Sequence, residues 1–213
     1  MRALVACLAL SALAPGAARA VPSAARSTIP AHAVLVGSSL GLADTTTGAF
    51  TIVARDAADN PVPDIVIEFR AINCPEARIA VDQLQPGVGA RCATNAVTAV
   101  TGPDGAVRMA VVGAGDPAAP HGSGPCAQVF AAGLPLGTVR LAYLDLDGSA
   151  GLGSNDLSVW LGDFGTGESI ARSDFDGDDV VGAEDLSLWL TAWAAGRETE
   201  SSGSWCSGFV ASP

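Results

Sequence analysis

Short apolar runs separated by turn residues dominate the first two thirds of the chain. The runs are four to seven residues long and rich in valine, isoleucine and alanine. Glycine, proline, aspartate and asparagine cluster between them, as in Asp59-Asn60-Pro61, and such residues favour turns. The pattern predicts a β-sandwich over residues 31–142, with strands at Ala33–Val36, Phe50–Ala54, Ile65–Phe69, Arg78–Val81, Val97–Val100, Ala106–Val112, Ala127–Ala131 and Gly137–Tyr143.

The spacing of apolar residues becomes helical after residue 143. Two segments carry apolar side chains at i, i+3, i+4 and i+7, which places them on one face of a helix. The two stripes are Leu157, Trp160, Leu161 and Phe164, and then Leu186, Trp189, Leu190 and Trp193. We predict two amphipathic helices whose stripes face each other in a small core. Core packing is therefore the expected role of the stripe tryptophans, rather than carbohydrate stacking.

These helical segments belong to an internal repeat. One copy reads DLDGSAGLGSNDLSVWLGDF from Asp145 to Phe164, and the other reads DFDGDDVVGAEDLSLWLTAW from Asp174 to Trp193. The copies align without gaps at an offset of 29 residues. Each copy starts with an aspartate-rich segment and continues into its predicted helix. The repeat predicts two copies of one loop-then-helix unit.

Acidic residues are concentrated in the repeat. The chain has no lysine and a formal net charge of −11, and eleven of its carboxylates lie between Asp145 and Asp185. Carboxylates this crowded repel one another unless a cation lies among them. The acidic balance argues against nucleic acid or an anionic membrane as partner.

Each acidic segment matches a twelve-residue calcium loop, which supplies oxygen ligands from positions 1, 3, 5, 7, 9 and 12. Water would complete position 9, which is Gly153 or Gly182. The predicted ligands of the first loop are Asp145, Asp147, Ser149, the Gly151 carbonyl and Asp156. Those of the second loop are Asp174, Asp176, Asp178, the Val180 carbonyl and Asp185. We expect Ca²⁺ at both loops, bound more strongly by the second, which has one carboxylate more.

Two positions depart from the usual calcium loop. Position 6 is normally glycine, because the backbone turns there with a positive φ, but here it is Ala150 or Asp179. Alanine tolerates that conformation poorly, so the alternative to calcium at both loops is a first site that is distorted or even empty. Position 12 is aspartate, which reaches less far than glutamate. Position 8 is apolar in both copies, and we expect Leu152 and Val181 to contact each other.

Loop-then-helix units in tandem, with aspartate at position 12, resemble a type I dockerin over residues 143–196. The resemblance implies a module that docks onto a cohesin module of a scaffold protein, often within systems that degrade polysaccharides. It also implies recognition through loop positions 10 and 11, here Ser154-Asn155 and Ala183-Glu184. These pairs differ, so equivalent binding by both copies is not expected. The stretch Arg55–Pro63 resembles a turn region of the invasin/intimin type of bacterial Ig-like domain.

The chain start predicts export. Arg2, the apolar stretch Ala3–Leu13 and the small residues Ala18-Arg19-Ala20 are typical of a cleaved signal peptide over residues 1–20. Loss of its two arginines changes the net charge from −11 to −13. We expect a linker at 21–30, a tail at 197–213 and no transmembrane segment. The protein is therefore expected to be secreted and extracellular, free or attached to a cell surface through a partner.

Four cysteines follow the signal peptide, which suggests disulfides in an exported chain. Cys74 and Cys92 are close in sequence and are expected to pair, which leaves Cys126 with Cys206. Sequence alone leaves the other pairings open. A zinc site is not expected, because the chain has no C-x-x-C pattern and only two histidines, His32 and His121.

No catalytic constellation is evident. Residues 37–41 match the G-x-S-x-G nucleophile elbow, but no helix is predicted after them. We therefore expect a secreted non-catalytic adaptor whose calcium-bound module docks onto a cohesin-like or other surface partner. One alternative is a component of an extracellular polysaccharide-degrading system, through carbohydrate binding or glycoside hydrolysis. The other is a structural cell-surface or adhesion protein.

Overall fold

The computed structural model of the chain describes residues 20–120, 122, 124–149, 151–166, 170–195 and 205–206. The expected signal peptide, apart from Ala20, lies outside these residues, as does the expected tail apart from Trp205 and Cys206. Ala150 and His121 also lie outside them. Within residues 21–30, expected to be a linker, Thr28 exchanges both backbone hydrogen bonds with Val53, at 2.8 and 2.9 Å.

The described chain is mainly β, as the apolar pattern predicts, and its two α-helices both follow residue 150. The strands are β1 His32–Val36, β2 Ser38–Ser39, β3 Leu42–Ala43, β4 Phe50–Val53, β5 Val66–Arg70, β6 Arg78–Ile79, β7 Gly89–Arg91, β8 Ala96–Val100, β9 Ala106–Met109, β10 Val111–Ala114, β11 Ala127–Ala131 and β12 Leu134–Tyr143. The helices are α1 Ser154–Thr166 and α2 Ala183–Ala194, with short 3-10 turns η1 Cys92–Thr94 and η2 Ala171–Ser173.

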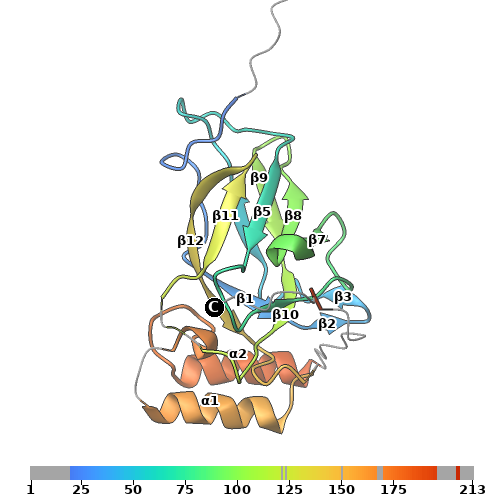
Figure 1. Cartoon of the computed structure of the whole chain (residues 1–213), viewed down its shortest axis with the longest axis vertical. Helices are drawn as coiled ribbons and strands as arrows, with labels where there is room; N and C mark the ends of the chain where they lie inside the picture. The colour runs from blue at the N-terminus through green and yellow to red at the C-terminus, as the bar shows by residue number, and fades with distance from the viewer. Residues whose placement is uncertain are drawn as a thin grey trace, which may run out of the picture.

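Eight strands form one sheet, in the order β6-β10-β1-β12-β11-β5-β8-β7. Strand β1 lies parallel to both β10 and β12, and the other pairs are antiparallel. The strands wrap around the core, so that the sheet is nearly closed (Figure 1). Two-stranded pairs β4-β9 and β2-β3 complete the β domain.

The apolar run Ala106–Val112, predicted as one strand, forms two strands that belong to different sheets. Strand β9 pairs with β4, whereas β10 pairs with β1 and β6. Ala110 separates them, and its N–H donates to the side chain of Gln85 at 3.0 Å. A side-chain acceptor therefore satisfies the backbone donor where the chain changes sheets.

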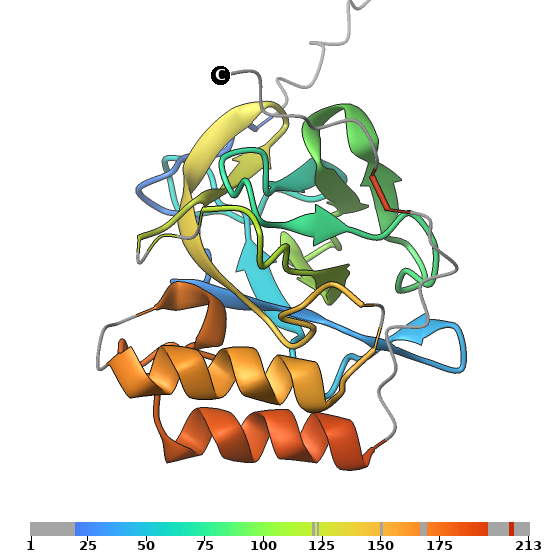
Figure 2. The same cartoon turned by 60° about the horizontal axis from the view of Figure 1, so that its bottom comes forward.

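The two helices lie against one end of the β domain (Figures 1 and 2). Strand β12 leads directly into the first acidic loop. Its pairing with β1 continues to Leu144, whose N–H donates to the Leu35 carbonyl at 3.1 Å. Trp160 of α1 and Trp189 of α2 are both 3% exposed and belong to the same apolar cluster as the β-domain core. One continuous core therefore holds the acidic loops against the sheet.

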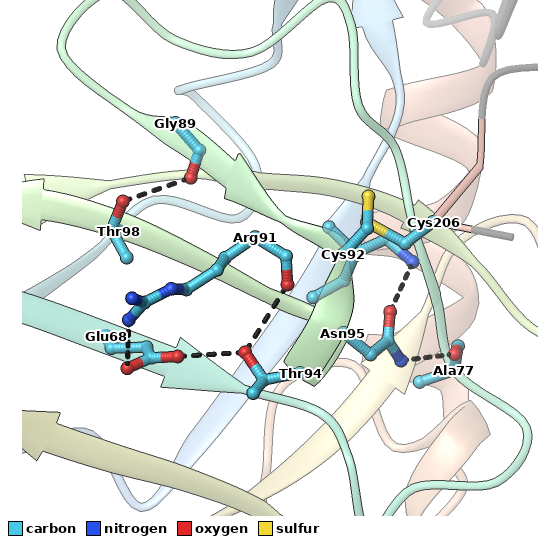
Figure 3. The surroundings of a disulfide bond; sticks show 10 residues. Glu68, Ala77, Gly89, Arg91, Cys92, Thr94, Asn95, Thr98 and Cys206 are labelled. Carbon is cyan, nitrogen blue, oxygen red and sulfur yellow. Dashed lines mark hydrogen bonds and ion pairs between the residues drawn. A yellow bond between two sulfur atoms is a disulfide. The ribbon is translucent and has the colours of Figure 1, made fainter. Parts of the chain in front are cut away.

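The expected pairing of Cys74 with Cys92 is wrong. The disulfides join Cys74 to Cys126 and Cys92 to Cys206, with Cα–Cα distances of 5.1 and 4.6 Å. Strands β5 and β11 are antiparallel neighbours, so the segment after β5, with Cys74, meets the segment before β11, with Cys126. The Cys206 N–H donates to the carbonyl of Ile79 in β6 at 2.9 Å. This bond holds Cys206 at the sheet, beside its disulfide partner Cys92 (Figure 3).

Candidate metal centre

Three carboxylates converge in each acidic loop. In the first loop they belong to Asp145, Asp147 and Asp156, and in the second to Asp174, Asp176 and Asp185. Within each trio, one oxygen per residue lies within 4.8 Å of the others. The residues at positions 1 and 12 are at most 1% exposed. Both clusters can hold a metal ion, and they occupy equivalent places in the repeat.

The carboxylate at position 1 organises the turn of its own loop. Asp145 and Asp174 each accept a hydrogen bond from the N–H of the glycine at position 4, both at 2.7 Å. These glycines, Gly148 and Gly177, have φ values of 69° and 82°. A left-handed backbone favours glycine, so the aspartate-to-glycine spacing lets each loop fold back around its first carboxylate.

The carboxylate at position 12 closes each loop through backbone hydrogen bonds. In both copies it accepts the N–H groups of positions 2, 3 and 9. Asp156 accepts from Leu146, Asp147 and Gly153 at 2.7, 2.9 and 2.7 Å. Asp185 accepts from Phe175, Asp176 and Gly182 at 2.5, 3.1 and 2.7 Å. The sequence repeat is thus also a repeat of hydrogen-bond geometry.

The remaining predicted ligands lie outside these two trios. The exposed Asp178 directs a carboxylate oxygen to the N–H of Val180 at 2.8 Å. Ser149 is exposed, and its N–H donates to Asp147 at 2.9 Å. Gly151 is half-buried, whereas Val180 is 59% exposed. The structure therefore brings together positions 1, 3 and 12 of each loop and leaves positions 5 and 7 at the rim.

Burial makes both clusters costly to keep charged without a cation. Burial raises the pKa of Asp156 and of Asp185 above the usual aspartate value, and the nearby carboxylate at position 3 acts in the same direction. Asp147 also loses hydration, but hydrogen bonds from Ser149 and Asn155 hold its pKa below the usual value. A bound cation would offset the cost of the buried charges.

The donor chemistry favours a hard cation. Each trio offers only carboxylate oxygens, and no cysteine or histidine belongs to either group. Ca²⁺ and Mg²⁺ prefer oxygen ligands, whereas structural zinc sites are built from cysteine and histidine. The residues present therefore fit calcium, which takes six to eight oxygens in flexible geometry.

A residue of the β domain, absent from the predicted site, also reaches the second loop. The guanidinium of Arg140, on β12, contacts Asp179 and lies 3.8 Å from Asp174. Asp179 is the position-6 residue, and its φ is 74°. The one sign of this contact in the sequence is an aspartate, rather than glycine, at position 6 of the second loop.

The helical stripes are only partly buried. Trp160 and Trp189 face the core. The aromatic residue four positions later stacks on each indole ring, with centroid distances of 5.2 Å from Trp160 to Phe164 and 6.1 Å from Trp189 to Trp193. The outer stripe residues are exposed: Leu161 53%, Phe164 52%, Leu190 41% and Trp193 54%. The expectation that the two stripes face each other in a small core of their own is not confirmed. Trp160 and Trp189 belong to the core shared with the β domain, and the outer stripe residues form apolar surface.

The G-x-S-x-G match is not a nucleophile elbow. The serine of the motif, Ser39, lies at the end of strand β2 and pairs with Leu42 of β3. Strand β3, rather than a helix, follows it. No strand-turn-helix therefore presents this serine to a substrate.

Comparison with known proteins assigns no family to this chain: no family model, curated protein or solved structure matches it. Among the described residues, no helix is both long and apolar enough to cross a membrane. The two disulfides are typical of oxidising compartments such as the extracellular space.

Proposed function

We propose that this protein is a secreted, non-catalytic adaptor that binds Ca²⁺ in its two acidic loops and docks onto a protein partner through α1 and α2. The observation that carries the proposal is the duplicated loop geometry, with three converging carboxylates per copy. Each loop leads directly into a helix whose outer stripe is apolar and exposed. Exposed apolar patches rimmed by polar residues are typical of interaction sites.

The resemblance to a type I dockerin supports this proposal at the level of the unit. Each unit is a loop followed by a helix, and the first loop follows strand β12 rather than a helix. On this proposal the partner is a cohesin-like module. Calcium supplies positive charge among the buried carboxylates when bound, and the chain's backbone N–H groups orient those carboxylates. Because only the folded loops bind it, calcium stabilises the docking-competent fold.

Calcium-dependent unfolding of the full-length chain tests the metal part of the proposal. At a hundredfold excess over the dissociation constant, one site stabilises by about 2.7 kcal/mol. For a chain of this size that raises the unfolding midpoint by about 5 to 10 °C relative to metal-free protein. A double variant, Asp145→Asn with Asp174→Asn, serves as control and should lose the shift. An unchanged midpoint in the wild-type protein would defeat the proposal.

The continuity of the core favours a second candidate, a structural surface or adhesion protein. Trp189 donates its indole N–H to the Leu144 carbonyl at 3.0 Å, within the core shared with the β domain. The Cys92–Cys206 disulfide also fixes the chain beyond α2 to the β domain. If this second function is right, the β domain is an Ig-like sandwich. The acidic module, residues 143–196, is then a rigid intramolecular spacer.

Capture from the exported proteins of the source organism separates the two candidates. An adaptor should retain a cohesin-like partner in calcium and release it in EGTA. Trp193→Ser with Phe164→Ser should abolish capture without unfolding the protein, because both side chains are about half exposed. Leu40→Ser, at a fully exposed apolar position elsewhere, should leave capture unchanged. Retention that ignores the helix variants would instead support the spacer.

A further inference from the structure

Arg140 places a cation from the β domain beside the second acidic loop. Its side chain is 16% exposed, and one guanidinium nitrogen contacts Asp179 while lying 3.8 Å from the buried Asp174. The other terminal nitrogen donates to the Gly177 carbonyl at 3.1 Å. The guanidinium therefore binds three residues of one loop, at positions 1, 4 and 6.

This contact accounts for the aspartate at position 6. A non-glycine residue at a φ of 74° is strained, and asparagine and aspartate tolerate it better than most. The Asp179 N–H donates to Asp174 at 3.1 Å, so the left-handed turn faces the position-1 carboxylate. The Asp179 side chain at the same time pairs with Arg140, an interaction that glycine could not make.

The β domain also limits how far the loop can move from Arg140. Gly177 lies against His32 of β1, and a methyl group added there would come within 2.9 Å of the His32 side chain. Strand β1 is hydrogen-bonded to β12, which carries Arg140. The loop and the guanidinium are therefore held by two neighbouring strands of one sheet.

A divalent cation at this loop would bind Asp174, Asp176 and Asp185, beside the guanidinium. The positive charges of the metal and of the guanidinium would repel each other across this short distance. Both would also be attracted to the single negative charge of Asp174, so each weakens the attraction of the other. Without the metal, Arg140 offsets the repulsion among the carboxylates. With the metal, the same charge opposes binding.

We infer that Arg140 is an internal counter-cation that competes with the metal for Asp174 and sets the affinity of the second loop. The inference rests on the proposed calcium binding and extends it to a residue outside the repeat. The β domain thereby keeps the second loop folded without metal and weakens its affinity. Metal binding at this loop is in turn coupled to the contact between the loop and the sheet.

The test uses full-length protein carrying Asp147→Asn, which weakens calcium binding by the first loop, as the parent. Further variants of this parent are compared by calorimetric Ca²⁺ titration and by thermal unfolding without metal. Arg140→Gln should tighten calcium binding about three- to tenfold and lower the metal-free unfolding midpoint. Asp179→Asn, which keeps the left-handed turn, should weaken calcium binding by a similar factor. Arg140→Lys should stay within about twofold of the parent, because it keeps the charge.

The opposite shifts separate competition from a merely structural role, which would weaken calcium binding in both variants. Arg55→Gln removes the same charge from an exposed pair with Asp59 and should leave the affinity unchanged. Calcium binding by the parent with unchanged or weaker binding by Arg140→Gln would overturn this inference alone. A parent that takes up no calcium would overturn the inference and the proposed function together.

Discussion

Glu68 is a buried carboxylate whose partners are all supplied by the β domain. It is 4% exposed and lies on β5, where Arg70 and Arg91 contact one carboxylate oxygen at 2.9 and 3.2 Å. Thr94 donates to the other oxygen at 2.9 Å (Figure 3). Arg70 also stacks over Phe130, 3.9 Å from the ring centroid. The network joins β5, β7, η1 and β11 on one face of the sheet.

The charged form of Glu68 should contribute stability at neutral pH. Burial raises its pKa, but the hydrogen bonds and charges of Arg70, Thr94 and Arg91 outweigh burial and hold the pKa below the usual 4.5. A depressed folded-state pKa gives stability that is present above pH 4.5 and lost as the pH falls through the folded value. Replacement by glutamine should therefore cost stability at pH 7 and little in acid.

Chemical denaturation of Glu68→Gln at pH 7 should show a loss of about 1–3 kcal/mol in unfolding free energy, because charged hydrogen bonds are lost in a buried site. The difference from wild type should shrink steadily below pH 4.5. Asp59→Asn breaks an exposed pair with Arg55 and should cost close to zero at either pH. A loss independent of pH would contradict a role for the carboxylate charge.

At the scale of the element, the carboxylates of the candidate site were predictable because each loop is local in sequence. A fixed spacing of aspartate and glycine within twelve residues is enough to bring positions 1, 3 and 12 together. Arg140 was not predictable, since it precedes the loop by more than thirty residues and approaches it only through the pairing of β12 with β1. Local patterns carry no information on such non-local approach.

The strands that sequence analysis missed are only two or three residues long, too short to show an apolar pattern. Strand β7, Gly89–Arg91, lies at the sheet edge and pairs only with β8. Strands β2 and β3 are two residues each and pair with each other. They are defined by hydrogen bonds to a partner strand, which a short local sequence does not reveal. The eight longer runs were visible because a buried face requires apolar residues.

The two helices show how a correct period can still misplace side chains. Spacing identified both helices, and the residues nearest each loop pack on the core, including Trp160 and Trp189. Their indole groups differ, because Trp189 donates to Leu144, whereas the buried Trp160 nitrogen has no hydrogen-bond partner among the described residues. The period gives the apolar face, but tertiary packing decides how much of that face is covered.

For the whole molecule, the disulfides follow topology rather than sequence distance. The Cys74–Cys126 bond spans 52 residues within the β domain, whereas Cys92–Cys206 spans 114 and encloses both acidic loops and both helices. Beside Cys206, Trp205 forms a bridge with Ala80 after β6. The acidic module is therefore fixed to the β domain at both of its ends, by β12 before it and by the disulfide after it.

Loss of this second anchor should destabilise the fold without removing the calcium response. Cys92→Ser with Cys206→Ser should lower the unfolding free energy by about 2–5 kcal/mol in urea, because the unfolded chain is no longer closed into a long loop. Cys74→Ser with Cys126→Ser should cost about 0.7 kcal/mol less on loop length alone. Calcium should still raise the unfolding midpoint of the Cys92/Cys206 variant, since every carboxylate of the two trios remains. An unchanged unfolding free energy in the Cys92/Cys206 variant would show that the module needs no anchor beyond the core it shares with the β domain. Loss of the calcium-dependent rise in its midpoint would show that this disulfide holds the loops in their metal-binding form.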